Sequence, residues 1–534
     1  MRLESQAVWG ANGADGPRGL EGMTLGELLE GIEVVGLTPG TAEAAAARAT
    51  APSITSLDYD SRRVSPGCLF FALAGVKTDG NRFVEEAVAR GAAAVASEQS
   101  RPEQLPERIW WVQVRAGRKA LALAAGNFYG WPSEGLDLVG ITGTNGKTTT
   151  AFLLDSILGV AGRRTGLFGT VFYRTPGRAV LATNTTPESL DLMRLLAELR
   201  QEGGTAAILE VSSHALALDR VWGLRFAAAV FTNLTRDHLD FHGTMDEYFA
   251  AKRRLFEGTG AGSPQAAILN LDDPHSRSLA GFSPRTITYG LGEGADVRAA
   301  VYRQSRAGLS FTARTPLGPI ELHSSLVGRV NVSNILAAAA AAISLGVDAQ
   351  AIAEGIAQMR TVPGRFERVE AGQPFLVVVD YAHTDDALAR LLETARELPL
   401  RGRVLLLFGA GGERDRAKRA MMGEAAGRGA DLVVVTSDNP RSEDPQAIVN
   451  EILPGLDRTG TPYSVAIDRA EAIAKILGEA RPGDVVLLAG KGHEAYQTIG
   501  SRVIPFDDRA VARESLRALG YSAPGREKTR GEGV

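Results

Sequence analysis

Residues 140–148 read GITGTNGKT and join a strand pattern to a helix pattern. Apolar residues dominate 136–142, and residues 149–161 carry apolar side chains at the spacing of one helix face. Glycines at such a junction let backbone N–H groups approach phosphate oxygens, which the N-terminus of a helix also attracts. Lys147 adds a cation, and the Thr148 hydroxyl can bind Mg²⁺. Although an isoleucine replaces the first glycine of the pattern G-x-x-x-x-G-K-[ST], the junction predicts binding of a nucleoside triphosphate.

Length and composition describe a folded chain of several domains. The 534 residues predict three or four domains, and 44% hydrophobic with 22% charged residues is ordinary for globular proteins. A net charge of -4 gives no reason to expect a nucleic-acid partner. Cys68 is the single cysteine, which excludes an intramolecular disulfide and fits a reducing compartment. We find no apolar signal segment in residues 1–22 and no run long enough to span a membrane, so a cytoplasmic protein without membrane insertion is expected.

Three blocks of alternating strands and helices follow one another along the chain. We expect a flexible extension at 1–22, domains at 23–135, 136–362 and 363–520, and a flexible tail at 521–534. Strands are expected at 68–72, 206–211, 228–231, 375–380, 404–408, 432–436 and 485–489. Continuous apolar strands between helices are typical of parallel sheets covered on both faces. The fold class is therefore α/β, with mostly parallel sheets in the second and third blocks.

Polar clusters follow each strand of the third block. They are YAH at 381–383, GAGGERD at 409–415, SDNPR at 437–441 and GKGHE at 490–494. Ligands of open α/β sheets bind beyond the carboxyl ends of the strands, so these clusters are expected to line one crevice. Ordinary surface loops are the alternative.

Two clusters of the second block point to a metal beside the phosphate loop. Glu210 ends the strand at 206–211, where its carboxylate could hold Mg²⁺, although a strand-end glutamate by itself more often forms an ion pair. Residues 232–242, TNLTRDHLDFH, bring together acids and histidines after another strand. A solvated turn is the alternative for this second cluster.

A series of motifs in order makes the chain resemble the Mur ligase family over about residues 23–520. The motifs are TGTNGKTTT, TTPESLDL, EVSSHALALDR, TNLTRDHLDFHG, NLDDPH, GRVNVSNILAA, PGRFERV, DYAHTDDAL, FGAGGERD, TSDNPR and GKGHEAYQ. The resemblance implies an N-terminal UDP-sugar domain, a central ATPase with a P-loop, and a Rossmann-like C-terminal domain for an amino acid. It also explains the variant phosphate loop, which is the form that this family uses.

The reaction implied by this resemblance is ATP-dependent amide formation in cytoplasmic peptidoglycan precursor synthesis. A substrate carboxylate attacks the γ-phosphate of ATP, and an amino acid then displaces phosphate from the acyl phosphate. Cations must neutralise this transition state, because two anions meet in it. By family analogy the catalytic residues are Lys147, Glu210, His238 and Lys252. ATP contacts are expected from Gly143, Thr144, Asn145, Gly146, Lys147, Thr148 and Thr149.

The resemblance also implies a magnesium cofactor and a modified lysine. The implied metal ligands are Thr148, Glu210, His238 and a carbamylated Lys252. Carbamylation turns a cation into an anionic oxygen ligand. Without the family, Lys252 would be interpreted as one of three adjacent basic residues on a solvated face.

The nucleotide substrate implied by the resemblance is UDP-MurNAc-L-Ala-D-Glu. Its expected contacts are Ser61, Asn184, Thr185, Thr186, Ser212 and Arg220. Two positions depart from the pattern of some members: Leu218 replaces a glutamine, and 76–78 read VKT in place of HQA. Individual contacts at those positions are therefore not carried over.

The incoming amino acid is expected to be meso-2,6-diaminopimelate, because residues 438–441, DNPR, resemble the signature of members that add it. Arg441 can hold the distal carboxylate of diaminopimelate bidentately, and lysine would leave it unpaired. The expected pocket is Arg414, Asp438, Asn439, Pro440, Arg441, Gly490 and Glu494. The alternative for Arg441 is that it only caps a turn.

Other functions remain open at this point. Another ligase of the same superfamily is the nearest alternative, such as folylpolyglutamate synthase or the enzyme that adds D-Ala-D-Ala, although DNPR and GKGHE argue against both. A nucleotide-binding regulatory module without catalysis is the alternative from a different class. The residues that argue against that loss are Lys147, Glu210, His238 and Lys252, all of them intact. We expect a monomer.

Overall fold

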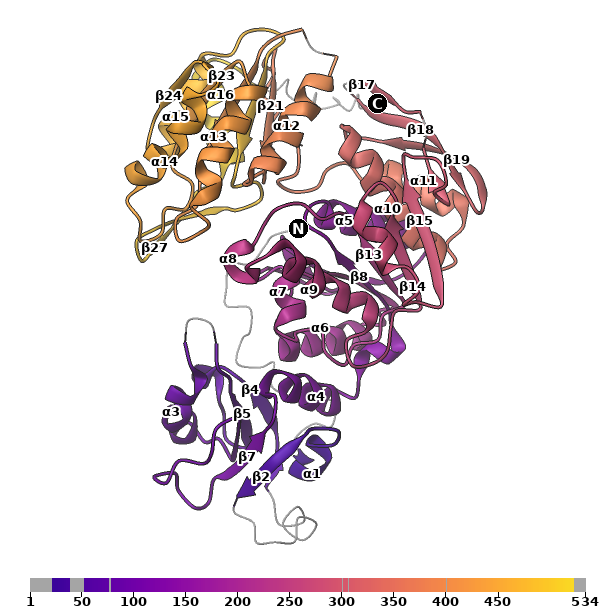
Figure 1. The fold of residues 1–534 in the computed structure, drawn as a ribbon, viewed down its shortest axis with the longest axis vertical. Helices are drawn as coiled ribbons and strands as arrows, with labels where there is room; N and C mark the ends of the chain where they lie inside the picture. Colours follow the sequence, from indigo (N-terminus) through magenta and orange to yellow (C-terminus); the bar gives the residue numbers. More distant parts are fainter. Residues whose placement is uncertain are drawn as a thin grey trace, which may run out of the picture.

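The computed structural model describes residues 22–38, 52–75, 78–299, 301–305, 307–399 and 401–522. Most of the expected extension at 1–22 and of the expected tail at 521–534 lies outside these residues, as do Val76 and Lys77. Figure 1 shows three lobes in chain order, coloured indigo, magenta and orange to yellow. In the described part of the chain, no helix combines the length and the apolar character needed to cross a membrane.

The first lobe is built on a five-stranded sheet with the order β2-β7-β6-β5-β4. Its strands are β2 Val34–Thr38, β4 Ser56–Asp58, β5 Cys68–Ala72, β6 Ala94–Ser97 and β7 Trp110–Val114. Short strands β1 Met23–Thr24 and β3 Ser53–Ile54 pair beside it, and the helices are α1 Leu25–Leu28, α3 Val84–Ala89 and α4 Gly117–Tyr129. The strand expected at 68–72 is confirmed as β5.

The central lobe contains a twelve-stranded sheet whose middle strands are parallel. Its strands are β8 Asp137–Thr142, β9 Thr165–Phe168, β10 Phe172–Arg174, β11 Ala179–Leu181, β12 Ala206–Glu210, β13 Ala228–Phe231, β14 Ala266–Asn270, β15 Arg285–Gly290, β16 Val297–Arg298, β17 Arg303–Ser305, β18 Gly308–Thr315 and β19 Gly318–Ser324. β8 lies between β12 and β13, so the polar groups that follow these three strands meet at one edge.

Helices cover both faces of the central sheet. They are α5 Lys147–Val160, α6 Ser189–Gln201, α7 Ser213–Ala217, α8 Leu239–His242, α9 Met245–Glu257, α10 Arg329–Ser344 and α11 Ala349–Gln358. The alanine run of α10 is buried, because small side chains let this helix pack closely beside α5 in one core cluster. The expected start of the first helix at residue 149 is wrong. α5 begins at Lys147, since Gly146 takes a left-handed conformation (φ +89°) and turns the chain directly into the helix.

The third lobe has a six-stranded sheet with the order β20-β21-β25-β22-β23-β24. The strands are β20 Glu367–Arg368, β21 Leu376–Asp380, β22 Val404–Phe408, β23 Leu432–Val435, β24 Tyr463–Val465 and β25 Val485–Ala489, followed by the hairpin β26 Tyr496–Ile499 and β27 Arg502–Pro505. The helices are α12 Asp385–Glu397, α13 Ala417–Gly429, α14 Pro445–Asp457, α15 Arg469–Gly478 and α16 Asp508–Ala518. Because β21, β25, β22 and β23 are parallel, the four polar clusters leave the sheet at the same edge.

Candidate active site

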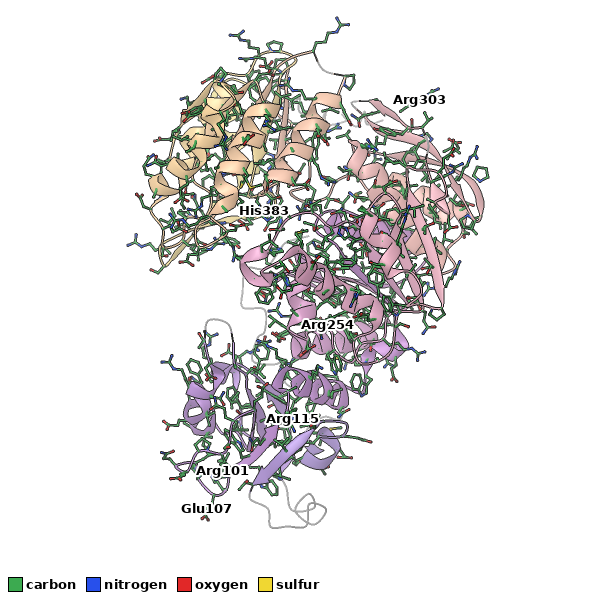
Figure 2. The ribbon with its side chains drawn as sticks, in the orientation of Figure 1. Arg101, Glu107, Arg115, Arg254, Arg303 and His383 are labelled. Atoms are coloured by element: carbon green, nitrogen blue, oxygen red, sulfur yellow. The ribbon has the colours of Figure 1, made fainter. Side chains whose placement is uncertain are left out.

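A cavity of about 720 Å³ lies between the central and third lobes and is lined by residues of both. Figure 2 labels His383, which lines this cavity, where the two lobes meet. Of the expected site residues, those that line it are Thr144, Asn145, Gly146, Lys147, Thr148, Thr149, Thr185, Glu210, Ser212 and His238. Residues expected to bind phosphate, metal and nucleotide substrate therefore share one space.

The phosphate loop after β8 has a backbone that only glycine allows. A Cβ on Gly143 (φ +142°) would lie 1.9 Å from Thr232 Oγ1, and one on Gly146 would lie 2.5 Å from Asn334 Oδ1. Lys147 Nζ donates to the carbonyl oxygens of Gly143 and Thr144, each at 2.9 Å. The lysine thus folds back over its own loop, where its ammonium borders the cavity.

The Glu210 carboxylate, at the end of β12, accepts three hydrogen bonds. Thr148 Oγ1 donates to Glu210 Oε2 at 2.9 Å, and the Thr170 N–H and hydroxyl donate to the same carboxylate at 2.9 and 3.0 Å. Only 1% of Glu210 is exposed. A hydroxyl and a carboxylate in contact offer the hard oxygen ligands that Mg²⁺ prefers, so this pair fits the expected metal.

Lys252 is buried in α9 and lies against the same loop. Its Nζ donates to Gly143 O at 3.0 Å and sits 4.2 Å from the centre of the Tyr248 ring. Burial, and next the neighbouring charge of Lys147, hold the pKa of the Lys252 amine well below its usual range. A neutral amine is the form that reacts with carbon dioxide, so the surroundings fit a carbamylated lysine. The solvated face that composition alone would suggest is wrong for Lys252.

His238 stands at the start of α8 in a left-handed conformation (φ 55°). Its Nε2 lies 3.3 Å from Asp237 Oδ2, and its ring centre lies 4.7 Å from that of His214. Burial lowers the pKa of His238, and a neutral imidazole ring is the form that binds metal. Within the described residues, no group of three or more His, Cys, Asp or Glu side chains could hold a metal by itself.

The third lobe adds residues that sequence reasoning did not select. Arg365 donates to Thr148 Oγ1 at 3.3 Å and lies 4.6 Å over the Tyr381 ring. Asp386 accepts from Asn145 Nδ2 at 3.1 Å and from Thr235 Oγ1 at 3.0 Å. The motifs PGRFERV and DYAHTDDAL contain Arg365 and Asp386, so the signal was present, but nothing in the sequence pointed to the phosphate loop as their partner.

Most residues expected to bind the nucleotide substrate are linked to each other. Thr186 Oγ1 donates to Glu210 O at 2.8 Å and accepts from the Ser212 N–H at 3.0 Å. Arg220 donates to Thr186 O at 3.0 Å. Asn184 also lies nearby in sequence, where its N–H donates to the Tyr173 hydroxyl at 3.0 Å.

Ser61 is separate from this group. It lies in the first lobe, and its hydroxyl donates to Glu86 Oε2 at 2.9 Å. Ion pairs connect the first lobe to the central lobe near this point, including Arg194 with Asp58 at 3.4 Å and Arg118 with Glu188 at 3.3 Å. The site for a long substrate would therefore run from the first lobe to the cavity.

The residues expected to bind the amino acid gather after β22, β23 and β25. Asn439 Nδ2 donates to Glu494 Oε2 at 2.8 Å, and a Cβ on Gly490 would lie 2.4 Å from Asp438 Oδ2. Burial, and next the charge of Asp438, raise the pKa of Glu494. Pro440 precedes Arg441 in the same loop, and the Pro440 carbonyl lies against Gly412.

The guanidinium of Arg441 faces the loop after β22. Its NH1 donates to Gly412 O at 2.5 Å, and a Cβ on Gly411 would lie 3.2 Å from this NH1 and 3.6 Å from Arg414 Cγ. The two arginines therefore lie close together around Gly411. Arg441 does donate to a loop carbonyl, as the turn-capping alternative requires. This hydrogen bond uses one of the five N–H donors of the guanidinium, so a ligand carboxylate could still bind to others.

Family models match most of the chain. The Mur ligase family catalytic domain matches residues 53–129, the Mur ligase middle domain 141–342, and the Mur ligase glutamate ligase domain 364–492. The UDP-N-acetylmuramoyl-L-alanyl-D-glutamate–2,6-diaminopimelate ligase of Solibacter usitatus is 53% identical over 93% of this chain and 99% of its own. The chain belongs to the Mur ligase family. A ligase of the same name from Geobacillus kaustophilus is 47% identical over 88% of this Mur ligase and 96% of its own length.

Solved structures agree with this assignment. A structure of a ligase with that same name has a TM-score of 0.62 and 34% identity, covering 88% of this Mur ligase and 96% of its own chain. MurF from Acinetobacter baumannii has a TM-score of 0.62 at 21% identity over 93% of this chain and 98% of its own, and so shares the fold. The resemblance inferred from the motifs and the α/β fold class are both confirmed.

Proposed function

We propose that this Mur ligase uses ATP to join meso-2,6-diaminopimelate to UDP-MurNAc-L-Ala-D-Glu, in the synthesis of peptidoglycan precursors in the cytoplasm. Relatives at 42–53% identity over most of the chain bear the name of this activity. The observation that carries the proposal is the joint presence of two groups. Thr148 with Glu210 forms an oxygen-rich corner at the phosphate loop, and Arg441, Asn439 and Glu494 gather at the carboxyl ends of the neighbouring sheet.

The first chemical step is transfer of the ATP γ-phosphoryl group to the D-glutamyl carboxylate. Lys147 at the loop and Arg365 from the third lobe would supply cations where two anions meet. Mg²⁺ would be held by Thr148 and Glu210, with His238 and a carbamylated Lys252 as further ligands. When bound, it would neutralise phosphate charge and orient the phosphoryl group.

The second step is attack of the diaminopimelate amine on the acyl phosphate. The new C–N bond forms, the C–O bond to phosphate breaks, and inorganic phosphate leaves carrying the proton that the amine gives up. Arg441 and Arg414 would hold the distal carboxylate, and Glu494 would accept a hydrogen bond from the distal ammonium. Lysine lacks that carboxylate, so it would leave a guanidinium without its anion.

The three lobes divide this work. The domain at 23–135 would bind the UDP-sugar through Ser61, and the domain at 136–362 would bind ATP and, through Asn184, Thr186, Ser212 and Arg220, the peptide end of the nucleotide. The domain at 363–520 would present the amino acid. We propose that the enzyme acts as a monomer, because each lobe in one chain supplies a part of the site.

Phosphate release in the presence of ATP, magnesium, UDP-MurNAc-L-Ala-D-Glu and diaminopimelate tests the proposed function. We expect release that requires all three substrates, together with a tripeptide product detected by mass spectrometry. The same assay with lysine in place of diaminopimelate distinguishes this enzyme from other amide ligases. Phosphate release at the same rate with and without the amino acid would contradict the proposal. A higher rate with lysine than with diaminopimelate would contradict it as well.

A further inference from the structure

Lys491 is a buried cation beside the amino-acid pocket. The proposed mechanism gives this lysine no role. It follows β25 in the sequence GKGHE, and none of its side chain is exposed. A buried ammonium is unfavourable unless hydrogen-bonded or charged partners compensate for its lost hydration. The surroundings of Lys491 show which groups it pairs with.

Lys491 Nζ makes two hydrogen bonds, both to residues of the expected pocket. It donates to Glu494 Oε2 at 3.2 Å and to Asn439 Oδ1 at 3.3 Å. Asn439 Nδ2 itself donates to Glu494 Oε2 at 2.8 Å, and the Thr498 N–H donates to Asn439 Oδ1 at 2.9 Å. The ammonium, the amide and the carboxylate form a closed triangle, which fixes the orientation of both Asn439 and Glu494.

The triangle leaves one oxygen of the carboxylate available. Both hydrogen bonds to Glu494 end on Oε2, and within the described residues none reaches Oε1. Fifteen per cent of the Glu494 side chain is exposed, whereas Lys491 is closed off. Oε1 can therefore accept a hydrogen bond from a ligand ammonium while Oε2 stays anchored.

Charge gives the lysine a second effect on the same carboxylate. Asp438 and Glu494 are close enough to repel each other, and the phenols of Tyr381 and Tyr496 face the same space. Lys491 from the same loop and Arg469 from α15 are cations that act on Glu494. Arg365 acts on Tyr381, and Arg414 and Arg441 act on Tyr496. Burial and Asp438 raise the pKa of Glu494, and the charge of Lys491 opposes that rise. Without the lysine, Glu494 would take up a proton at higher pH.

We infer that Lys491 is a positioning residue for the amino-acid substrate: it anchors Glu494 and Asn439 so that a negatively charged carboxylate oxygen meets the substrate's distal ammonium. This inference rests on the proposed function, because it assigns a diamino acid to the pocket. Lys491 itself does not touch the substrate; it acts through Glu494. A neutral donor at this position would keep one hydrogen bond and lose the charge.

Kinetics of three variants test this inference. Lys491→Gln keeps a donor without charge, Lys491→Arg keeps the charge, and Lys475→Gln removes an exposed lysine from α15 of the same domain as a matched control. In Lys491→Gln we expect the KM for diaminopimelate to rise by about 10- to 100-fold with a smaller change in kcat and with the KM for ATP unchanged. Lys491→Arg should recover much of the loss, and Lys475→Gln should match the unmodified enzyme.

The pH profile separates positioning from general damage to the fold. Ionised Glu494 is required, so kcat/KM for diaminopimelate falls as pH drops through the pKa of Glu494. In Lys491→Gln that acid limb should move to higher pH, and in Lys491→Arg it should return. An unchanged KM and an unmoved acid limb would overturn the inference.

A double-mutant cycle of Lys491→Gln with Glu494→Gln tests whether the lysine acts through the glutamate. If Lys491 acts through Glu494, the two substitutions have less than additive effects on kcat/KM for diaminopimelate. Additive effects would overturn the inference. If the unmodified enzyme adds diaminopimelate and these variants behave like it, only the inference fails. If the unmodified enzyme forms no amide with any diamino acid, the proposed function fails.

Discussion

The Thr148 hydroxyl donates a hydrogen bond of 2.9 Å to Glu210 Oε2, although 62 residues separate the two in the chain. Thr148 is the second residue of α5, which follows β8, and Glu210 ends β12, which pairs with β8 in parallel. The parallel register puts the ends of both strands at one edge of the sheet, where a metal and a triphosphate would meet.

Glu210→Gln tests the carboxylate at this edge. The amide keeps the shape of the side chain but removes the negative charge, so we expect phosphate release to fall by about 100- to 1,000-fold. The binding of UDP-MurNAc-L-Ala-D-Glu should change little, because the contact of Thr186 is with the Glu210 backbone. Steady-state phosphate release and titration calorimetry measure the two effects. Near-normal turnover would show that the carboxylate is not required.

Lys147→Ala tests the cation of the phosphate loop. The ammonium now bonds to the carbonyls of Gly143 and Thr144, and it is the loop's own charge for the γ-phosphate. We expect phosphate release to become undetectable, while Lys475→Ala, a change at an exposed position of α15 in the third lobe, serves as a comparison for general effects on stability. Substantial turnover by the Lys147 variant would mean that the loop is assigned wrongly.

Lys252→Met tests the buried lysine through stability as well as activity. Burial lowers the pKa of this amine in the folded protein, so the unfolded chain binds more protons and stability rises with pH toward the lysine's usual pKa. Methionine removes that dependence. We expect loss of activity with a higher melting temperature at neutral pH, by about 2–4 °C for each kcal/mol gained.

The matching measurement is thermal unfolding of both proteins across pH 6 to 9. A flatter pH dependence in Lys252→Met is expected. A melting temperature that falls at every pH would contradict the assignment of a neutral, unfavourably buried amine. A carbamate on Lys252 forms from carbon dioxide. Depleting carbon dioxide from the buffer should therefore lower the activity of the enzyme that keeps Lys252.

Arg441→Ala tests the choice of amino acid. Diaminopimelate loses the partner of its distal carboxylate, so we expect its kcat/KM to fall by about a thousandfold, with the KM for ATP unchanged. Arg441→Lys should recover little, since an ammonium lacks the planar fork of a guanidinium. Competition between diaminopimelate and lysine, read by product mass, is the measurement. Unaltered selectivity would remove Arg441 from the pocket.

The sequence predicted those parts of the site that a short segment determines. The glycines, lysine and threonine of 140–148 lie next to each other, and the apolar strands before each polar cluster are local patterns, so both could be recognised. Arg365 and Asp386 could not be placed in the same way. Arg365 meets Thr148 across 217 residues, and Asp386 meets Asn145 across 241, and only the packing of two lobes creates such contacts.

Local sequence also misjudged the environment of single residues. Lys252 is followed by two further basic residues, which suggested an exposed face. In the structure α9 turns Lys252 inward toward Gly143, because the buried side of the helix is set by Tyr248 and Leu255. The helix start at Lys147 was likewise missed, since the left-handed turn at Gly146 is a property of the folded loop.

The central claim is that a carboxylate oxygen of the substrate attacks the γ-phosphorus of ATP at the corner formed by Thr148 and Glu210. Isotope transfer tests it most directly. UDP-MurNAc-L-Ala-D-Glu labelled with ¹⁸O in the reacting carboxylate is turned over with ATP and diaminopimelate, and the released phosphate is analysed by mass. One ¹⁸O atom in each phosphate is the predicted result, and tripeptide formed with unlabelled phosphate would contradict the account.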